Sequence, residues 1–209
     1  KVFGTIAELG EAPLGAPAPV PSSDDETAYL QFSSGSTRFP IGVAVTHHAL
    51  MENLRSILMH GLQVVPDDRA VSWLPLYHDM GLVGFLLAPL AGQVTVDFLS
   101  PQEFARRPHL WLKLLSENQG TLSYSPSFGY ELCARRIRRD TAATPDLDLS
   151  SWRVAGIGGD IIRPHVLQRF AEAFAPSGFN AGAFVPSYGM AEATLAISFA
   201  PLGKGLSTD

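Results

Sequence analysis

The sequence predicts an α/β fold with a largely parallel, mixed sheet flanked by helices. Two observations predict it. Short apolar runs of strand length alternate with segments of helical period along most of the chain. The chain also has 209 residues, of which 46% are hydrophobic and 17% charged, so it is long and apolar enough to fold around a core. No internal repeat is visible, which disfavours a solenoid.

The elements follow one another in a regular order. Residues 8–26 hold four prolines and the acidic run 24–26, a composition typical of a solvated connector, so we expect residues 1–26 to be a linker or domain edge. The α/β unit then covers residues 27–209. Its predicted strands are residues 28–33, 43–47, 70–75, 94–99, 121–126, 153–158 and 184–188, with helices between most of them.

Two helices carry clear boundary signals. Ser100, Pro101 and Glu103 are an N-cap, a first-turn proline and a capping-box carboxylate in the right order, so a helix begins there. Another helix begins at Pro164 and stops before Gly178. Its apolar residues recur at spacings of three and four and predict one stripe facing the sheet: Val166, Leu167, Phe170, Ala171 and Phe174.

Charge and cysteine content exclude several classes of protein. Lys and Arg total 15 against 20 Asp and Glu, a net charge of -5, which argues against a nucleic-acid or anionic-membrane binder. Cys133 is the single cysteine, so no internal disulfide or multi-cysteine zinc site is expected, and a reducing, cytoplasmic location fits. No apolar run reaches the roughly 18 residues of a spanning helix, so we expect no membrane insertion. The chain starts at Lys1 and ends in a Gly-rich stretch, which suggests a fragment of a longer polypeptide.

A hydroxyl-rich segment follows the first predicted strand. Hydroxyl donors beside a glycine, where the backbone approaches a ligand closely, suit phosphate oxygens. An ordinary Ser/Thr turn is the alternative. The segment is not a Walker loop, and neither a GxSxG nor an HExxH motif occurs. The residues of this candidate phosphate loop are Ser33, Ser34, Gly35, Ser36 and Thr37.

Four segments together resemble the adenylate-forming superfamily of acyl-CoA synthetases, luciferases and peptide-synthetase adenylation domains. They are the hydroxyl-rich loop with its continuation (33–42), WLPLYHDMGLVG (73–84), GIGGDIIRP (156–164) and SYGMAEAT (187–194), in the family's order. The wording of residues 78–82 and 188–194 is most similar to fatty acyl-AMP ligases. The resemblance covers about residues 27–205 and implies part of the large N-terminal domain of an acetyl-CoA-synthetase-like fold.

The resemblance also implies a reaction. In such enzymes a carboxylate attacks the α-phosphorus of ATP, pyrophosphate leaves, and an acyl-adenylate forms with Mg²⁺ bound to the nucleotide. The substrate implied here is a fatty acid, and the acyl group then passes to the thiol of an acyl carrier protein or, as the alternative, of CoA. Catalysis of this kind depends mainly on positioning and charge stabilisation.

Residue roles follow from the same resemblance. The loop 33–37 matches the segment that holds the β- and γ-phosphates, Tyr188 the aromatic residue that stacks on adenine, and Glu192 the catalytic carboxylate near Mg²⁺. A core tyrosine and a surface carboxylate are the alternatives for the last two. The other residues matched to the nucleotide site are Gly158, Gly159, Asp160, Ser187, Gly189, Met190 and Ala191, of which Gly158 to Asp160 also fit a plain strand-to-helix turn.

The second motif points to the acyl substrate. His78 matches a residue that positions the carboxylate, and Tyr77 and Met80 are candidates for the mouth of an acyl tunnel. Asp79 fits either the site or a structural hydrogen bond. The segment 79–92 is apolar nearly all round, which suits a buried helix or a tunnel wall.

The chain departs from the family pattern in two ways. Ile41 stands where many members carry a lysine, so phosphate contacts must come from hydroxyls, backbone amides and Arg38. No segment resembles the later ribose-binding aspartate motif or the C-terminal domain with its catalytic lysine. We therefore expect residues 1–209 alone to have little adenylation activity. An acyl-CoA synthetase fragment and a degenerate, non-catalytic nucleotide-binding module remain the alternative interpretations.

Overall fold

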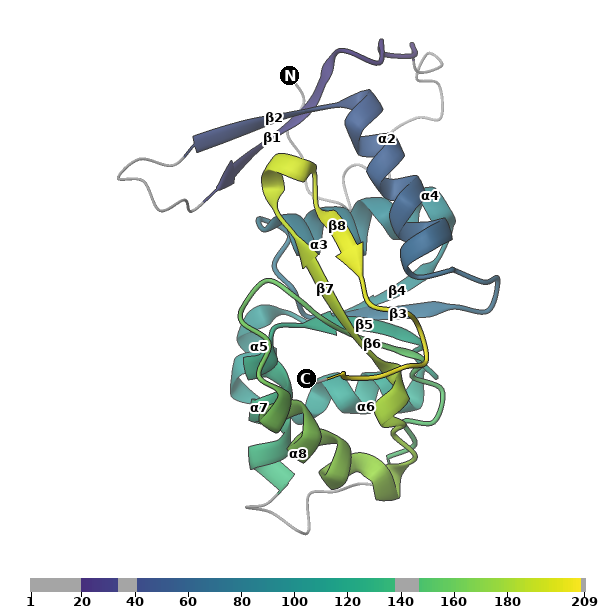
Figure 1. Ribbon diagram of the computed structural model, residues 1–209, viewed down its shortest axis with the longest axis vertical. Helices are drawn as coiled ribbons and strands as arrows, with labels where there is room; N and C mark the ends of the chain where they lie inside the picture. The colour runs from purple at the N-terminus through teal and green to yellow at the C-terminus, as the bar shows by residue number, and fades with distance from the viewer. Residues whose placement is uncertain (1–19, 34–40, 138–146, 208–209) are drawn as a thin grey trace, which may run out of the picture.

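The computed structural model describes residues 20–33, 41–137 and 147–207, and its centre is a six-stranded sheet (Figure 1). The strand order is β4-β3-β5-β6-β7-β8, in which the first five strands are parallel and β8 is antiparallel to β7. This confirms the predicted mixed, mostly parallel α/β sheet. The strands are β3 (Arg69–Ser72), β4 (Thr95–Phe98), β5 (Leu122–Ser125), β6 (Val154–Ile157), β7 (Phe184–Gly189) and β8 (Ala196–Phe199).

Helices cover both faces of this sheet (Figure 1). On one face lie α2 (His47–Arg55), its π-helical continuation η1 (Ser56–Gly61), and the run α3 (Asp79–Leu82), η2 (Val83–Leu87) and α4 (Ala88–Gly92). On the other lie α5 (Pro101–Arg106), α6 (His109–Glu117), α7 (Ser127–Ile137) and α8 (Pro164–Phe174). Three short 3₁₀ turns complete the described elements: η3 (Ala175–Ser177), η4 (Ala181–Ala183) and η5 (Ala191–Ala193).

The first two predicted strands differ from the others in their pairing. They form an antiparallel hairpin of their own, β1 (Thr27–Ser33) with β2 (Ile41–Thr46), which projects from the sheet (Figure 1). Strand β8 was not predicted. Of the expected linker, residues 20–26 are exposed and contain neither helix nor strand, and residues 1–19 lie outside the described residues.

Both predicted helix boundaries are confirmed. The Ser100 hydroxyl accepts a hydrogen bond from the backbone N–H of Glu103 (3.1 Å), while the Glu103 carboxylate pairs with Arg107 (2.7 Å). Helix α8 begins at Pro164 and buries Val166, Leu167, Phe170 and Phe174. Its end passes through η3 to Gly178, whose φ of 82° lies in the left-handed region.

An aromatic cluster fills the space between the sheet and α6–α8. Trp111, Tyr130, Trp152 and Phe170 are almost fully buried. Four of their ring pairs meet edge to face at centroid distances of 5.0–6.1 Å, and the fifth, Tyr130 with Trp152, is stacked at 6.2 Å. The Trp111 indole donates to Ser123 (2.8 Å) and the Tyr130 hydroxyl to the Gly156 carbonyl (2.9 Å). The polar atoms of these two rings are therefore hydrogen-bonded, and the bonds attach β5 and β6 to helices α6 and α7.

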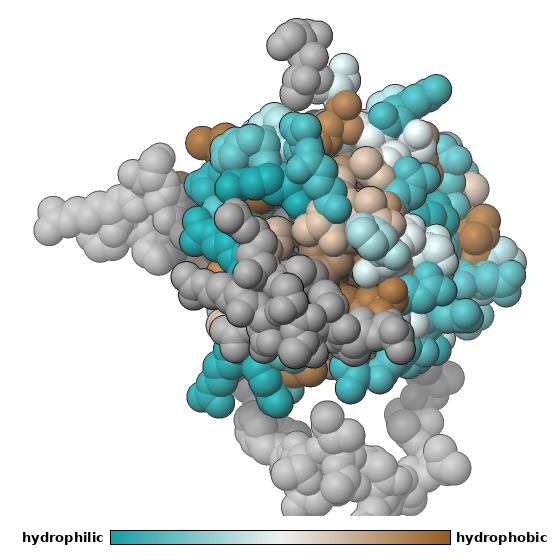
Figure 2. Space-filling model, turned by 90° about the horizontal axis from the view of Figure 1, so that it is seen from below, coloured by the Kyte–Doolittle hydropathy of each residue, from teal (hydrophilic) through white to brown (hydrophobic). Residues whose placement is uncertain are grey.

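The outer face of this helical layer is largely hydrophilic, with apolar side chains in small scattered groups (Figure 2). No helix in the described part of the chain has the length and hydrophobicity that crossing a membrane requires.

A buried ion pair ties together the amino ends of β3 and β6. The Asp68 side chain is 1% exposed and accepts hydrogen bonds from Arg153 Nε (2.8 Å), the Thr121 hydroxyl (2.7 Å) and the Val65 N–H (2.9 Å). Arg153 also donates to the carbonyls of Leu62 (3.0 Å) and Gln63 (3.1 Å). Burial alone would raise the pKa of Asp68, but the hydrogen bonds from Arg153, Val65 and Thr121 outweigh it, so the pKa is lowered.

This pair predicts acid-sensitive stability. A carboxyl whose pKa is lower in the folded than in the unfolded chain stabilises the fold above the unfolded pKa of about 3.9 and loses that contribution as the pH falls further. Asp68→Asn should lower the free energy of unfolding at pH 7 by about 3 kcal/mol, the lower end for a broken buried pair, because Arg153 is 31% exposed. Urea unfolding at pH 7 and pH 3 measures both effects.

The control is Asp97→Asn, which removes the partner of Arg69 at a more exposed pair on β3 and β4. Its cost at pH 7 should stay near or below about 1 kcal/mol. Equal losses in the two variants would contradict a special role for Asp68.

Candidate functional site

A cavity of about 440 Å³ lies between the sheet, the helical run α3–α4, η1 and the β7–β8 hairpin. It brings together residues of three predicted motifs that are far apart in the sequence. Those lining it are Tyr77, His78, Asp79 and Met80 of the second motif, Gly158 and Gly159 of the third, and Ser187, Tyr188, Gly189, Met190, Ala191 and Glu192 of the fourth.

The topology of the sheet explains why these motifs meet. Residues 77–80 follow β3, residues 158–159 follow β6, and residues 187–192 end β7, so all three lie at the carboxyl edge of the parallel strands. From β3 the chain runs outward to β4, whereas β5, β6 and β7 run outward in the other direction. Ligands of open α/β sheets bind at the carboxyl edge beside such a change of direction.

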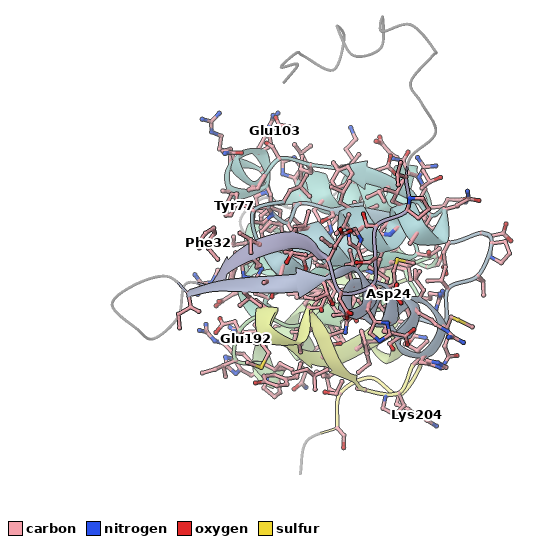
Figure 3. All side chains as sticks on the ribbon, turned by 90° about the horizontal axis from the view of Figure 1, so that it is seen from above. Asp24, Phe32, Tyr77, Glu103, Glu192 and Lys204 are labelled. Atoms are coloured by element: carbon pink, nitrogen blue, oxygen red, sulfur yellow. The ribbon has the colours of Figure 1, made fainter. Side chains whose placement is uncertain are left out.

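Most of the predicted phosphate loop lies outside the described residues, and only the strand before it, β1, can be placed at the cavity. Ser33 is the last residue of β1, and Ser34, Gly35, Ser36 and Thr37 lie outside the described residues. Gln31 and Phe32 line the cavity, and the Gln31 side chain donates to the Tyr77 carbonyl (3.2 Å). Figure 3 places Phe32, Tyr77 and Glu192 on the same side of the molecule, so β1 leads the chain to the cavity mouth.

His78 and Asp79 form a hydrogen-bonded pair at the start of α3. The distance from His78 Nδ1 to Asp79 Oδ1 is 2.6 Å, and the Met80 N–H also donates to Asp79 Oδ1 (2.7 Å). The hydrogen bond to Asp79 outweighs burial and raises the pKa of His78. Because Nδ1 faces Asp79 and also lies 3.3 Å from the Met80 N–H, Nε2 is the nitrogen left for a ligand. Asp79 is buried, orients His78 and also lines the cavity, so it fits both the structural role and the site role that the sequence left open.

The turn between β7 and β8 presents Glu192 at the cavity. A Cβ at Gly189 would lie 1.9 Å from the Leu195 carbonyl oxygen, so only glycine fits. The Met190 N–H donates to that same oxygen (2.8 Å) and closes the turn. Thr194 is buried with a φ of 69°, a strained conformation for a β-branched residue. Such strain persists where the surrounding structure requires it, often at functional sites.

Sequence reasoning missed Asn53, which holds this hairpin from the side. Its amide on α2 donates to the Ala196 carbonyl (2.9 Å) and accepts from the Ala196 N–H (3.1 Å). The two bonds satisfy the edge of β8 and fix the hairpin against α2. An asparagine in a helix interior, where its propensity is poor, was the available signal.

The third motif is only partly placed at the cavity. Gly159 has a φ of 76°, which favours glycine, and a Cβ there would lie 3.3 Å from Met80 Cε, so this loop packs against α3. Asp160 is exposed and does not line the cavity, and its carboxylate accepts from the Ile161 N–H (2.7 Å). A strand-to-helix turn, the alternative that the sequence also allowed, is sufficient to explain Asp160.

The other end of the cavity is apolar. The sheet contributes Ala70 and Leu122, and the helical run contributes Gly84, Phe85, Ala88 and Pro89. One side of the segment 79–92 therefore lines a hollow instead of packing solidly. The remaining apolar lining residues are Ile57, Leu58, Leu62, Val64, Val94, Leu195, Ala196 and Phe199.

The acidic residues fit a nucleotide-bound metal better than a protein-enclosed one. Glu192 is exposed and lines the cavity, and among the described residues no group of three His, Cys, Asp or Glu side chains could hold an ion. Mg²⁺ keeps several waters and is commonly held by one or two carboxylates plus substrate phosphates. A single carboxylate at an open cavity fits that pattern.

Comparison with known proteins decides the family. The family model described as AMP-binding enzyme matches residues 4–208. The chain belongs to the AMP-binding enzyme family. Two curated relatives illustrate the similarity. A Caulobacter vibrioides protein whose name describes it as an acyl-CoA synthetase is 58% identical over 99% of this chain. A medium-chain fatty-acid–[acyl-carrier-protein] ligase of Teredinibacter turnerae is 44% identical over 83% of it.

Solved structures of AMP-binding enzymes agree with the fold. One from a study of fatty acyl-adenylate ligases of E. coli and L. pneumophila superposes with a TM-score of 0.86 and 52% identity, covering 95% of this chain. The chain spans 35% and 27% of the two curated relatives and 36% of the solved chain. It therefore corresponds to between a quarter and about a third of the length of these proteins.

Proposed function

We propose that this chain is the acyl- and nucleotide-binding part of a ligase that joins a fatty acid to AMP. In this reaction a carboxylate oxygen attacks the α-phosphorus of ATP, the bond to pyrophosphate breaks, and acyl-AMP forms. The observation that carries the proposal is one cavity with two unlike ends, the motif residues at the carboxyl edge of the sheet and an apolar hollow beyond them. Such a cavity suits a molecule with a polar head and an alkyl chain.

Each end has residues suited to its part of the ligand. At the polar end Tyr188 and the Gly158–Gly159 loop would hold adenine, and the 33–37 loop the phosphates. His78 Nε2 would position the fatty carboxylate. Glu192 would hold the Mg²⁺, which when bound supplies positive charge against the phosphates. Each methylene buried at the apolar end contributes about 0.8 kcal/mol.

For the acceptor we propose the thiol of an acyl carrier protein. The name of the Teredinibacter turnerae relative supports a carrier protein, whereas the name of the Caulobacter vibrioides relative supports CoA. The motif wording favours the acyl-AMP ligases, and a cytoplasmic location fits the single cysteine, Cys133, which is buried and unpaired. A non-catalytic module is the remaining alternative, because Ile41 supplies no cation.

The test uses the longer protein that carries this chain. We expect fatty-acid-dependent exchange of pyrophosphate into ATP, followed by transfer of the acyl group to a pantetheine-bearing carrier protein in preference to free CoA. Exchange with equal or better transfer to CoA would favour the synthetase alternative. No exchange with any fatty acid would contradict the proposed function and favour the non-catalytic module.

Tyr188→Ala should weaken ATP binding selectively. The ring is 63% exposed and lines the cavity, so its loss leaves the core intact. If it stacks on adenine, its removal should raise the KM for ATP about tenfold, because base–aromatic stacking contributes about 1–3 kcal/mol. Steady-state kinetics with ATP and with the fatty acid varied separately make the measurement. An unchanged KM for ATP would make Tyr188 a surface residue only.

A further inference from the structure

Two amide side chains hold the backbone of two different walls of the cavity. One wall consists of residues 77–80 and the other of residues 187–192, and in the view of Figure 3 the β1–β2 hairpin runs between Tyr77 and Glu192. Gln31 of β1 bonds to the 77–80 wall, and Asn53 of α2 bonds to the strand that follows the 187–192 wall. Each wall is thus held by a residue far from it in the sequence.

Gln31 holds the wall that carries His78. Its side chain is 8% exposed, and its amide donates to the Tyr77 carbonyl (3.2 Å). The Tyr77 side chain is exposed, so this bond fixes the backbone. Tyr29 lies two residues earlier on the same face of β1, and burial together with the nearby charge of Asp79 raises the pKa of Tyr29 to about 12. Strand β1 therefore reaches both sequence neighbours of His78.

Asn53 holds the wall that carries Tyr188 and Glu192. Its amide bonds to both backbone polar groups of Ala196, at 2.9 Å and 3.1 Å, as a neighbouring strand would. Ala196 is the cross-strand partner of Gly189, at the point where the register of β7 with β8 shifts. Strand β8 is four residues long and is the last strand of the described sheet. The two bonds therefore stabilise the base of the turn that presents Glu192.

We propose that Asn53 and Gln31 are positioning residues for different substrates, Asn53 for ATP and Gln31 for the fatty acid. The inference rests on the proposed function, since it takes Tyr188 and Glu192 as the nucleotide side and His78 as the carboxylate side. Each amide acts through the backbone that it holds, and binding groups must stay within about 1 Å of their productive positions. Because separate bonds hold the two walls, loss of one amide should disturb one substrate and spare the other.

The test measures KM for ATP and KM for dodecanoate in ATP–pyrophosphate exchange by the longer protein. Asn53→Leu keeps the approximate size of the side chain and removes both bonds, so it should raise the ratio of KM for ATP to KM for dodecanoate about tenfold. Gln31→Met likewise keeps the size and should lower the same ratio about tenfold. KM does not depend on enzyme concentration, so a purely structural role, which reduces the amount of folded protein, leaves the ratio unchanged.

Gln168→Met is the matched control for both variants. Gln168 is an exposed amide on α8, where it donates to Glu172 on the face of the sheet opposite the helical run α3–α4. Its ratio should equal that of the unsubstituted protein. Asn53→Asp and Gln31→Glu keep the shape of the side chain and remove only the donated bond. They make the same test if either apolar variant does not fold.

The outcomes separate this inference from the proposed function. A ratio that rises in Asn53→Leu, falls in Gln31→Met and stays constant in Gln168→Met supports the inference. Any other pattern in a protein that catalyses exchange, including unchanged ratios or shifts in one direction, would overturn the inference and leave the proposed function standing. No exchange with any fatty acid in the unsubstituted protein would overturn the proposed function and this inference with it.

Discussion

Glu192→Ala should lower fatty-acid-dependent ATP–pyrophosphate exchange on the order of 10²–10³-fold, the size measured when one electrostatic group is removed from a charged transition state. Glu192 is exposed, so its loss should leave the fold intact, and it lines the cavity at the end of β7. Among the described residues, no group of three His, Cys, Asp or Glu side chains could hold the ion in its place. Exchange rates measured across a range of Mg²⁺ concentrations should also show a higher Mg²⁺ requirement.

The control for this variant is Glu172→Ala. Glu172 is an exposed carboxylate on α8, on the opposite face of the sheet, where it accepts from Gln168. Its removal changes the net charge equally and should leave exchange unchanged. Undiminished exchange in Glu192→Ala would show that Glu192 is a surface carboxylate, the alternative that its sequence pattern also allows.

Gly189→Ala should reduce exchange on the order of 10²-fold through geometry alone. The added methyl group would lie 1.9 Å from the Leu195 carbonyl oxygen and 2.9 Å from its carbon, which are backbone atoms that cannot rotate away. The turn must open, and Tyr188 and Glu192 on either side of it move from the cavity. Misplacement by about 1 Å can cost on the order of 10²-fold in rate.

Overpacking of this kind should also lower the free energy of unfolding by about 1–3 kcal/mol, measurable by urea denaturation. Gly203→Ala is the matched control, because Gly203 has a φ of 74° but no atom within 4 Å of the Cβ position. It introduces backbone strain without a clash and should keep full exchange. Full exchange in Gly189→Ala would contradict the account of the turn.

Local chemistry made several elements predictable from the sequence. The Ser100 cap and the apolar stripe of α8 depend on residues within a few positions of one another, and both are confirmed. The pairing of β1 with β2 was not predictable, because strand-like alternation does not say which strands pair. Strand β8 escaped prediction for a related reason: it is four residues long, and residues 190–195 before it contain no Gly, Pro or Asn, the residues that usually mark a turn.

The candidate site shows the same contrast between what local sequence predicts and what depends on residues far apart in the chain. Motif wording located Tyr77, His78, Met80 and the segment 187–192, which the fold brings to one cavity. The clamp from Asn53 was invisible because its partner Ala196 is 143 residues away. The packing of the Tyr124 ring over Gly156 on the neighbouring strand likewise depends on which strands become neighbours, and Asp160 matched a motif yet does not line the cavity.

The central claim is that one cavity holds both the nucleotide and the acyl chain. A crystal structure of the longer protein with a non-hydrolysable acyl-adenylate analogue tests it most directly. We expect the adenine ring against Tyr188 and the alkyl chain in the apolar end of the same cavity. An alkyl chain outside this cavity, or an adenine remote from the 187–192 segment, would contradict the account.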